Sequence, residues 1–290
     1  MKPRAPSDLA SGPSGVVSPG PRLYLLSRPA LDRREIARFS RDEGLGWKQT
    51  RGAAEAERLI EFAGRICYMS FGKLQSRKSN RDYIRRLIDQ EHESVLEHAS
   101  WTFLLTGVSR AFTHQMVRHR VGFSFSQLSQ QYHDEATAKF VMPAELKGES
   151  PAESAGAAAE VRGLWLRIIE ELQRDYQSIT DELESEYLRS HPTHKAGKRL
   201  PKEVLRSIRS VARSLLPNAT GTKLVFSANG RSLRHFLDLR GAILGDLEMR
   251  AVSALIYTRL LREAPALLCD FEMIVHEDGY PLIRRKRVTY

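Results

Sequence analysis

The chain has 290 residues, 41% of them hydrophobic and 28% charged, so it can bury one large core or two small ones. A formal net charge of +10 favours anionic partners, which include nucleic acids, acidic membrane surfaces and small molecules that carry phosphate. There are two cysteines without a Cys-x-x-Cys pair, and no run of about 18 apolar residues, which argues against a disulfide framework, a zinc finger and a membrane-spanning helix.

The two ends of the chain differ in composition from the middle. Residues 1–21 are rich in Ser, Gly and Pro and lack an apolar signal-peptide centre, so we expect a disordered leader there. Residues 284–290 begin with the run Arg284-Arg285-Lys286-Arg287, which we expect to be a solvated basic tail. One folded domain is expected between them, over 22–283. The low cysteine content fits a reducing, cytoplasmic location.

The residue pattern in the first half of the chain predicts two strands with a pair of helices between them. An apolar run over 22–26 predicts a strand, and a polar connection follows it as far as about Gly52. Apolar residues recur at helical spacing over 59–67 and 83–88, and the β-favouring run over 100–108 predicts a second strand. Ser109 can cap a helix that runs through Arg118-His119-Arg120 and ends near Gly122. A loop or short strand follows over 123–132.

The second half is mainly helical. After a stretch rich in Gly, Ser, Pro and Ala over 148–159, a long helix carries one apolar stripe, which we expect to face the core or another subunit. Apolar spacing predicts a further helix over 204–215, ended by Pro217. A strand over 222–229, a short helix over 230–240 and a last helix from about 243 to 263 complete the pattern. The stripe of the long helix consists of Leu164, Ile168, Leu172, Ile179 and Leu183.

The segment that carries the chemistry begins at Arg118-His119-Arg120. Two guanidiniums stand directly before a run dense in hydroxyl and amide groups, over 124–131. Because Arg binds phosphate oxygens in a bidentate fork, this pattern predicts a site for a phosphate or pyrophosphate. The same residues would also suit a basic helix C-terminus, which the helix dipole favours, and their spacing alone does not decide between the two.

Four separated motifs match one family in the same order. The run RHRVGFSFSQLSQQY over 118–132 resembles the signature of the flavin-dependent thymidylate synthases, and HESVLEHASWTF (92–103), RSLLP (213–217) and NGRSLRHFLDLR (229–240) match further segments of that family. The resemblance covers roughly 23–271. It implies an α+β fold in which a mixed or antiparallel sheet is flanked by helices and long helices pack subunits together. It also implies a homotetramer with its sites at subunit interfaces.

The resemblance implies reductive methylation of dUMP to dTMP, with FAD as cofactor and with NADPH and methylenetetrahydrofolate as co-substrates. Carried over residue by residue, one group of positions contacts FAD and a second group surrounds the nucleotide, with Arg118 in both. The FAD group contains Ser94, Glu97, Arg118, His119, Arg120, Asn229, Arg231 and His235. The nucleotide group contains Gln115, Arg118, Gln127, Leu128, Ser129, Gln130, Gln131, Arg213 and Arg240.

Arg240 is the candidate catalytic residue. Carbon 5 of uracil is a poor nucleophile, and a fixed cation near the N3 and carbonyl edge of the ring would stabilise the negative charge that develops as it is activated. From its position alone, Arg240 would be a surface residue at a helix end. The other way to activate uracil is addition of a cysteine thiolate to carbon 6. Cys67 and Cys269 both lie in apolar runs and are expected to be packed, which supports the flavin route.

Three departures from the family pattern bear on the substrate. One additional residue separates Arg120 from Ser129, near Gly122, so the loop is expected to bulge. Gln131 stands where the family usually has Arg, and Leu244 stands where it often has His. Loss of one charge from the nucleotide pocket motivates an alternative, in which a related enzyme methylates another uridine nucleotide, such as UMP, in specialised metabolism.

The basic balance also prompts a hypothesis of another class, a nucleic-acid-binding module. Arg206, Arg209 and Arg213 fall on one predicted helix. They interleave with an apolar face, and no platform of aromatic and basic residues accompanies them, so nucleic acid is an unlikely partner.

A metal site is a further alternative, because His92, Glu93, Glu97 and His98 form a compact acid-imidazole group. The two histidines are six residues apart and would face different sides of a helix, unlike the pair of a His-Glu-x-x-His zinc site. No metal is therefore expected. A Gly-rich dinucleotide fingerprint and a Gly-Lys-Ser/Thr phosphate loop are absent from the sequence, so a flavin must be held by another architecture.

Overall fold

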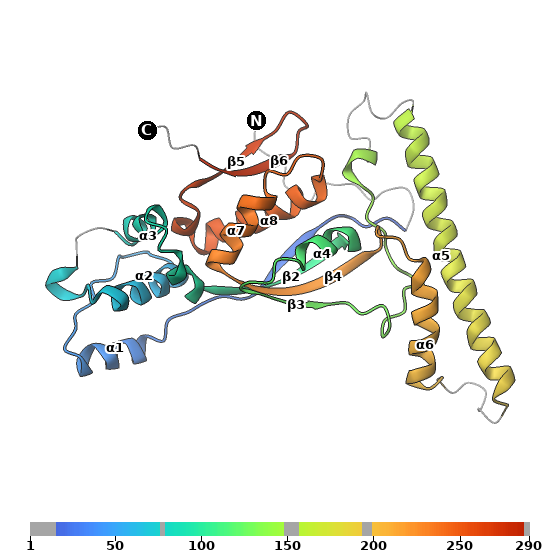
Figure 1. Ribbon diagram of the computed structural model, residues 1–290, viewed down its shortest axis with the longest axis horizontal. Helices are drawn as coiled ribbons and strands as arrows, with labels where there is room; N and C mark the ends of the chain where they lie inside the picture. Colours follow the sequence, from blue (N-terminus) through green and yellow to red (C-terminus); the bar gives the residue numbers. More distant parts are fainter. Residues whose placement is uncertain (1–15, 76–78, 148–156, 193–198, 287–290) are drawn as a thin grey trace. The chain divides into compact units, whose positions relative to one another are not determined.

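The computed structural model describes residues 16–75, 79–147, 157–192 and 199–286, and it shows a mixed α+β fold in which antiparallel sheets are flanked by helices (Figure 1). Most of the elements predicted from the sequence are present within a few residues of the expected bounds. The strands are β1 (Arg22–Ser27), β2 (Ser100–Ser109), β3 (Phe123–Gln127), β4 (Gly221–Asn229), β5 (Phe271–Val275) and β6 (Pro281–Arg285). The helices are α1 (Arg33–Asp42), α2 (Glu55–Tyr68), α3 (Asn80–Asp89), α4 (Arg110–Met116), α5 (Ala157–Ser190), α6 (Lys202–Ala212), α7 (Gly230–Arg240) and α8 (Leu247–Glu263), with short 3₁₀ helices that include η3 (Glu93–His98), η5 (Arg213–Leu215) and η6 (Pro265–Leu268).

The strands form one four-stranded and one two-stranded sheet. The larger sheet has the order β1-β2-β4-β3, and β5 pairs with β6 in an antiparallel hairpin. The chain divides into two compact units, and this division cuts through the range 22–283 that we expected to form one domain. The first unit contains 1–21, 106–116 and 127–224, and the second contains 22–105, 117–126 and 225–290. The strands β2, β3 and β4 each have residues in both units.

In the second unit, α7 and α8 provide much of the core. Leu233, Phe236 and Leu237 of α7 are fully buried, and so are Val252 and Ile256 of α8. Both helices pack against β6 of the terminal hairpin (Figure 1). Burial of these side chains removes a large apolar area from water, which fixes α7 in place along its whole length.

A buried arginine of α8 holds the hairpin. The Arg250 side chain is fully buried, and it donates hydrogen bonds of 2.9 Å to the carbonyl oxygens of Tyr280 and Pro281. It also pairs with Asp278, with 3.0 Å between Nη2 and Oδ1. These hydrogen bonds hold the pKa of the Asp278 carboxyl far below its ordinary value. A buried guanidinium is tolerated here because its donors are satisfied.

The C-terminal end of α7 meets the hairpin at a glycine. Ile283 N donates a hydrogen bond of 2.9 Å to the carbonyl oxygen of Gly241, the residue that follows Arg240. A Cβ atom at position 241 would lie 2.6 Å from Ile283 Cβ and 2.8 Å from the Ile283 carbonyl oxygen. Only glycine allows this close approach, so the position of Arg240 depends on it.

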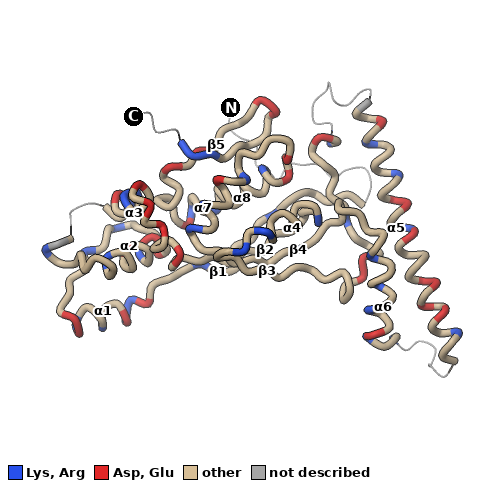
Figure 2. The backbone as a smooth tube through the Cα atoms, viewed as in Figure 1, with Lys and Arg blue, Asp and Glu red and all other residues tan. Residues whose placement is uncertain are grey.

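In the first unit, the long helix α5 lies beside α6 (Figure 1). Ile169 and Tyr176 of α5 are buried, whereas Leu164 and Ile168 of the expected stripe are 48% and 46% exposed. The start of the expected stripe is therefore not packed in the core of this chain, and its packing against another subunit stays a prediction. Acidic and basic residues are spread along the whole of α5 (Figure 2).

Two segments differ from the sequence prediction. The polar connection expected before Gly52 contains α1, whose start is capped by Asp32, with its carboxylate accepting from Arg34 N at 2.9 Å. None of the α1 residues is buried, and three of its residues, Ile36, Ala37 and Phe39, are apolar, so the segment was interpreted as a polar connection. Cys67, expected to be packed, is exposed near the end of α2. Burial raises the pKa of the half-buried Cys269 thiol.

The two chain ends are only partly described. Residues 1–15 of the expected leader and 287–290 of the expected tail lie outside the described residues. Val17 forms a β-bridge with Phe140 of the first unit. Arg284 and Arg285 belong to β6, and Arg284 pairs with Glu272 at 2.8 Å. None of the helices in the described ranges is long and apolar enough to cross a membrane.

Replacement of Gly241 by Ala tests the close contact between the C-terminal end of α7 and the hairpin. The added methyl group collides with the backbone and side chain of Ile283, so we expect Gly241→Ala to lower the free energy of unfolding by about 1–3 kcal/mol. Urea denaturation followed by circular dichroism measures this. Gly46→Ala is the control, because no atom lies within 4 Å of a Cβ at that position. Equal stability of the two variants would contradict the close approach.

Candidate active site

In the second unit, the turn that carries Arg118-His119-Arg120 rests on the start of α7. Phe123 N donates to the Arg120 carbonyl oxygen at 3.3 Å and closes a β-turn in which Gly122 has a φ of +71°. A positive φ at the third position is what a type II turn requires, and glycine supplies it. Asn229 N donates to the Gly122 carbonyl oxygen at 3.2 Å, and Ser232 Oγ donates to the Val121 carbonyl oxygen at 2.8 Å.

This turn corrects the prediction that Arg118-His119-Arg120 ends a helix. The helix α4, capped by Ser109 Oγ as predicted, ends at Met116. The arginines therefore lie beyond the last helical turn, and a favourable helix dipole does not account for them. The Arg118 and Arg120 side chains are exposed, and neither has an ion-pair partner among the described residues. Two cations without counter-ions form a local site of positive potential.

The half-buried His119 side chain turns toward the end of α7. Its Nε2 accepts a hydrogen bond of 3.1 Å from Arg240 Nε. The imidazole packs edge-on against Phe236, with 5.1 Å between ring centroids, and it lies 6.0 Å from the Phe123 ring. The His235 ring lies 6.2 Å away. Burial, then Arg240 and His235, lowers the pKa of His119 below its ordinary value.

The 3₁₀ helix η3 also packs against α7 in the second unit. Ser94 and Glu97 are exposed on η3, while Val95 and Leu96 between them are buried. Glu97 Oε1 pairs with Arg231 Nη1 at 2.7 Å. The structure therefore gathers all eight positions of the expected FAD group, from three distant segments, in one unit: Ser94, Glu97, Arg118, His119, Arg120, Asn229, Arg231 and His235.

A buried arginine that the motif reading did not assign fixes α7 to its neighbours. Arg234 is 1% exposed and donates to both carboxylate oxygens of Asp270, at 2.6 and 2.8 Å, and to the Leu267 carbonyl oxygen. Its Nη2 also lies 3.5 Å from Glu93 Oε1 on η3. Arg234 holds the pKa of Asp270 below its ordinary value, although burial alone would raise it. The only signal in the sequence was an arginine on the apolar face of the helix.

Most of the expected nucleotide group lies in the first unit. Gln115 is on α4, Gln127 is the last residue of β3, and 128–131 follow the strand. Gln131 Nε2 donates to Ser210 Oγ on α6 at 3.0 Å, so this segment lies against the helix face that leads to Arg213. Gln127 Nε2 donates to Thr113 Oγ1 at 2.8 Å. Two members of the nucleotide group, Arg118 and Arg240, belong to the second unit. The members in the first unit are Gln115, Gln127, Leu128, Ser129, Gln130, Gln131 and Arg213.

Two further arginines of the first unit support the 127–134 segment. Arg110 Nη2 donates to the Leu128 carbonyl oxygen at 2.6 Å, and burial lowers the pKa of Arg110. Arg209 Nη1 donates to the Tyr132 carbonyl oxygen at 2.9 Å, and only 13% of its side chain is exposed. Arg209 thus serves the protein's own backbone, which weakens the hypothesis of a nucleic-acid-binding helix. Neither role follows from local sequence, since both contacts join distant residues.

Three of the four residues considered for a metal site, His92, Glu93 and Glu97, have other partners. Glu93 and Glu97 face guanidiniums, and His92 Nδ1 lies 2.9 Å from the Tyr68 hydroxyl oxygen. Among the described residues, no three or more His, Cys, Asp or Glu side chains are gathered in a way that could hold a metal ion.

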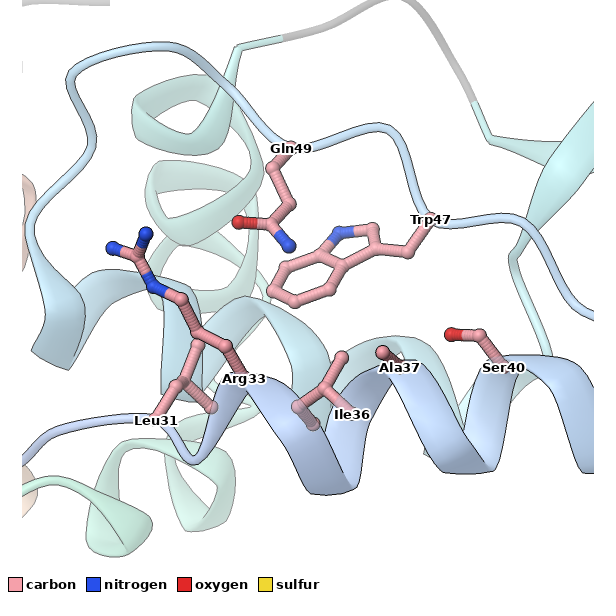
Figure 3. Close-up of a pocket in the computed structure, with 7 residues that line it drawn as sticks. All are labelled: Leu31, Arg33, Ile36, Ala37, Ser40, Trp47 and Gln49. Carbon is pink, nitrogen blue, oxygen red and sulfur yellow. The ribbon is translucent and has the colours of Figure 1, made fainter.

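A cavity of about 220 Å³ lies elsewhere in the second unit, between α1 and the segment after it (Figure 3). The Trp47 indole and the Gln49 side chain form one wall, and Ile36 and Ala37 of α1 face them. It contains none of the expected site residues.

Comparison with known proteins agrees with the motifs. The family described as thymidylate synthase complementing protein matches residues 50–266. A flavin-dependent thymidylate synthase of Mycobacterium sp. (strain KMS) is 38% identical over 232 residues, which are 80% of this chain and 86% of the relative. The chain belongs to the flavin-dependent thymidylate synthase family. Proteins of that name from Corynebacterium efficiens and Mycobacterium tuberculosis (strain H37Ra) are each 36% identical, over 87% and 76% of this chain and 93% and 82% of the relatives.

The structure shows the surroundings of the three positions at which we expected this chain to depart from the pattern of the flavin-dependent thymidylate synthase family. The loop expected to bulge near Gly122 contains the type II turn, in which Val121 is 86% exposed. Gln131 is tied to Ser210 of α6. Leu244, in the connection between α7 and α8, is 65% exposed.

Replacement of Gly122 by Ala tests the contact between the turn and the start of α7. Alanine at a φ of +71° is strained by about 1–2 kcal/mol, and its Cβ would lie 2.1 Å from Ser232 Oγ and 2.5 Å from Asn229 Nδ2. We expect the free energy of unfolding to fall by about 2–4 kcal/mol, the sum of backbone strain and collision. Chemical denaturation measures the change.

Gly44→Ala is the matched control for this substitution. Its φ is +65° and no atom lies within 4 Å of the added Cβ, so only the backbone strain applies. If both variants lose the same stability, the turn does not rest on α7 as described.

Proposed function

We propose that this protein converts dUMP to dTMP by reductive methylation, with FAD as cofactor and with methylenetetrahydrofolate and NADPH as co-substrates. Family membership supports this reaction, since relatives that span most of the chain are named flavin-dependent thymidylate synthase. The observation that carries the proposal is the meeting of the Arg118–Arg120 turn with α7 in the second unit, joined by the hydrogen bond from Arg240 to His119.

The residues of the second unit fit a flavin dinucleotide by their chemistry. The exposed guanidiniums of Arg118 and Arg120 offer bidentate donors for a pyrophosphate, and the start of α7 beside them favours an anion. Arg231 and Glu97 add a cation and an acceptor for the polar groups of the cofactor. Bound FAD would supply the reducing equivalents for methylation, and NADPH would restore them.

The residues of the first unit suit a uridine nucleotide. Gln127, Ser129 and Gln130 provide amide and hydroxyl groups, and Arg213 provides a cation for the phosphate. Arg110 and Arg209 fix the backbone that carries these groups, as their hydrogen bonds to Leu128 and Tyr132 indicate. We propose the same positions for the nucleotide as the family resemblance implies.

We propose that the protein acts as a homotetramer in the cytoplasm, with sites at subunit interfaces. What supports assembly is the long helix α5, on which Val161, Leu164 and Ile168 are about half exposed at helical spacing. A stripe of this kind suits a helix that packs against another subunit. The two cysteines, both unpaired, fit a reducing location.

The proposed reaction is tested first by the colour and activity of the purified protein. We expect flavin absorption bands, and dTMP formed from dUMP when methylenetetrahydrofolate and NADPH are present. The rate is compared with the rate for UMP under the same conditions. A clear preference for UMP would favour the alternative substrate that Gln131 suggests, and a protein that stays colourless after FAD is added would contradict both.

Replacement of Arg240 by Ala tests the catalytic role. Loss of a cation that stabilises negative charge on the uracil ring should lower kcat about 10²–10³-fold, with a much smaller effect on FAD affinity. Arg262→Ala is the matched control, because Arg262 is an exposed arginine in the last turn of α8 in the same unit. Steady-state kinetics and FAD titration measure the two effects. Unchanged kcat in Arg240→Ala would remove Arg240 from the mechanism.

A further inference from the structure

The hydrogen bond between Arg240 and His119 restricts the protonation state of the imidazole. Arg240 Nε carries a hydrogen and can only donate, so His119 Nε2, 3.1 Å away, must accept. A neutral imidazole accepts at one nitrogen and donates at the other, which places its proton on Nδ1. Protonated His119 has no acceptor and would set a second cation beside the guanidinium. The contact therefore requires neutral His119.

The surroundings of His119 favour this state. Its ring is packed edge-on against Phe236, a fully buried residue of α7. The charged and titratable groups that act on it are Arg240 and His235, both also on α7. Both groups are basic, so neither of them stabilises an imidazolium. Burial, then Arg240 and His235, keeps the pKa of His119 below its ordinary value.

We infer that neutral His119 is a positioning residue that fixes the plane of the Arg240 guanidinium for methyl transfer, and that protonation of His119 releases it. This inference rests on the catalytic role proposed above for Arg240. The Nε–H and the Nη groups of arginine share one plane, so an acceptor at Nε sets the direction of the whole group. Because Phe236 holds the imidazole, the acceptor is in place before a substrate arrives, as an electrostatically preorganised site requires.

Two substitutions separate the acceptor from the ring. His119→Phe keeps an aromatic ring against Phe236 but removes the acceptor. His119→Gln offers a carbonyl oxygen near the position of Nε2 that does not titrate. At FAD concentrations that saturate each variant, we expect His119→Phe to lower kcat about 10–100-fold at every pH, because the guanidinium is no longer aligned. His119→Gln should have a kcat at neutral pH that is clearly higher than that of His119→Phe.

The pH profile distinguishes positioning from a merely structural role. In the unsubstituted protein, kcat should fall as the pH drops through the pKa of His119, which lies below the ordinary value of 6.5. In His119→Gln this acid limb should disappear, since the acceptor cannot be protonated. An acid limb that persists unchanged in His119→Gln, or a kcat in His119→Phe equal to that of the unsubstituted protein, overturns the inference.

A second measurement needs no activity. NMR of the protein with ¹⁵N-labelled histidine reports which imidazole nitrogen carries the proton, and His119→Gln identifies the signal. We expect the Nδ1–H form, and we expect Arg240→Met, which removes donor and charge, to raise the pKa of His119. An Nε2–H form at neutral pH, or an unchanged pKa, overturns the inference alone. A protein that methylates no uridine nucleotide overturns the proposed function, and with it the dependence of methyl transfer on His119.

Discussion

The proposed cofactor site depends on a short contact between a turn and a helix cap. Gly122 and Val121 each offer a carbonyl oxygen, and these accept from Asn229 N and Ser232 Oγ at the start of α7. Asn229 also caps α7 through Ser232 N, so one asparagine serves both the helix and the turn. The partners are 111 residues apart in the chain, as measured from Val121 to Ser232. Without this contact, nothing local would bring the arginines of the turn to the helix.

Buried charge then fixes the other side of the same helix. Arg234 is almost fully buried, and both of its Nη groups are paired, with Asp270, Leu267 and Glu93 as their partners. Removing one partner of such a pair leaves an uncompensated charge in the interior, which is far more unfavourable than losing a surface ion pair. The position of η3 relative to α7 is therefore strongly specified. The same contacts fix the positions of Ser94 and Glu97, which are exposed on η3.

The sequence predicted the secondary-structure elements and the candidate site residues better than it predicted the contacts between them. The strands over 22–26 and 100–108 and the helices around Leu59 and Tyr83 followed from local periodicity, and the motifs named the residues that meet at α7. The end of α4 at Met116 was missed, because the turn after it is stabilised by a contact with Asn229 that no local pattern encodes. Arg234 and Arg110 were missed for the same reason: both act through long-range hydrogen bonds to backbone or buried carboxylates.

The turn combines two arginines that must stay exposed with a histidine that must stay neutral. The structure meets both requirements. Arg118 and Arg120 remain solvated, so their charge is stabilised by water rather than by a counter-ion. His119 lies between them but is partly withdrawn from water against α7, and its proton affinity falls as a result. An anion bound by the arginines would offset part of their charge and make protonation of His119 easier. Burial of His119 and its contact with Arg240 lower its pKa, and so they act against this effect of a bound anion and favour an imidazole that remains an acceptor.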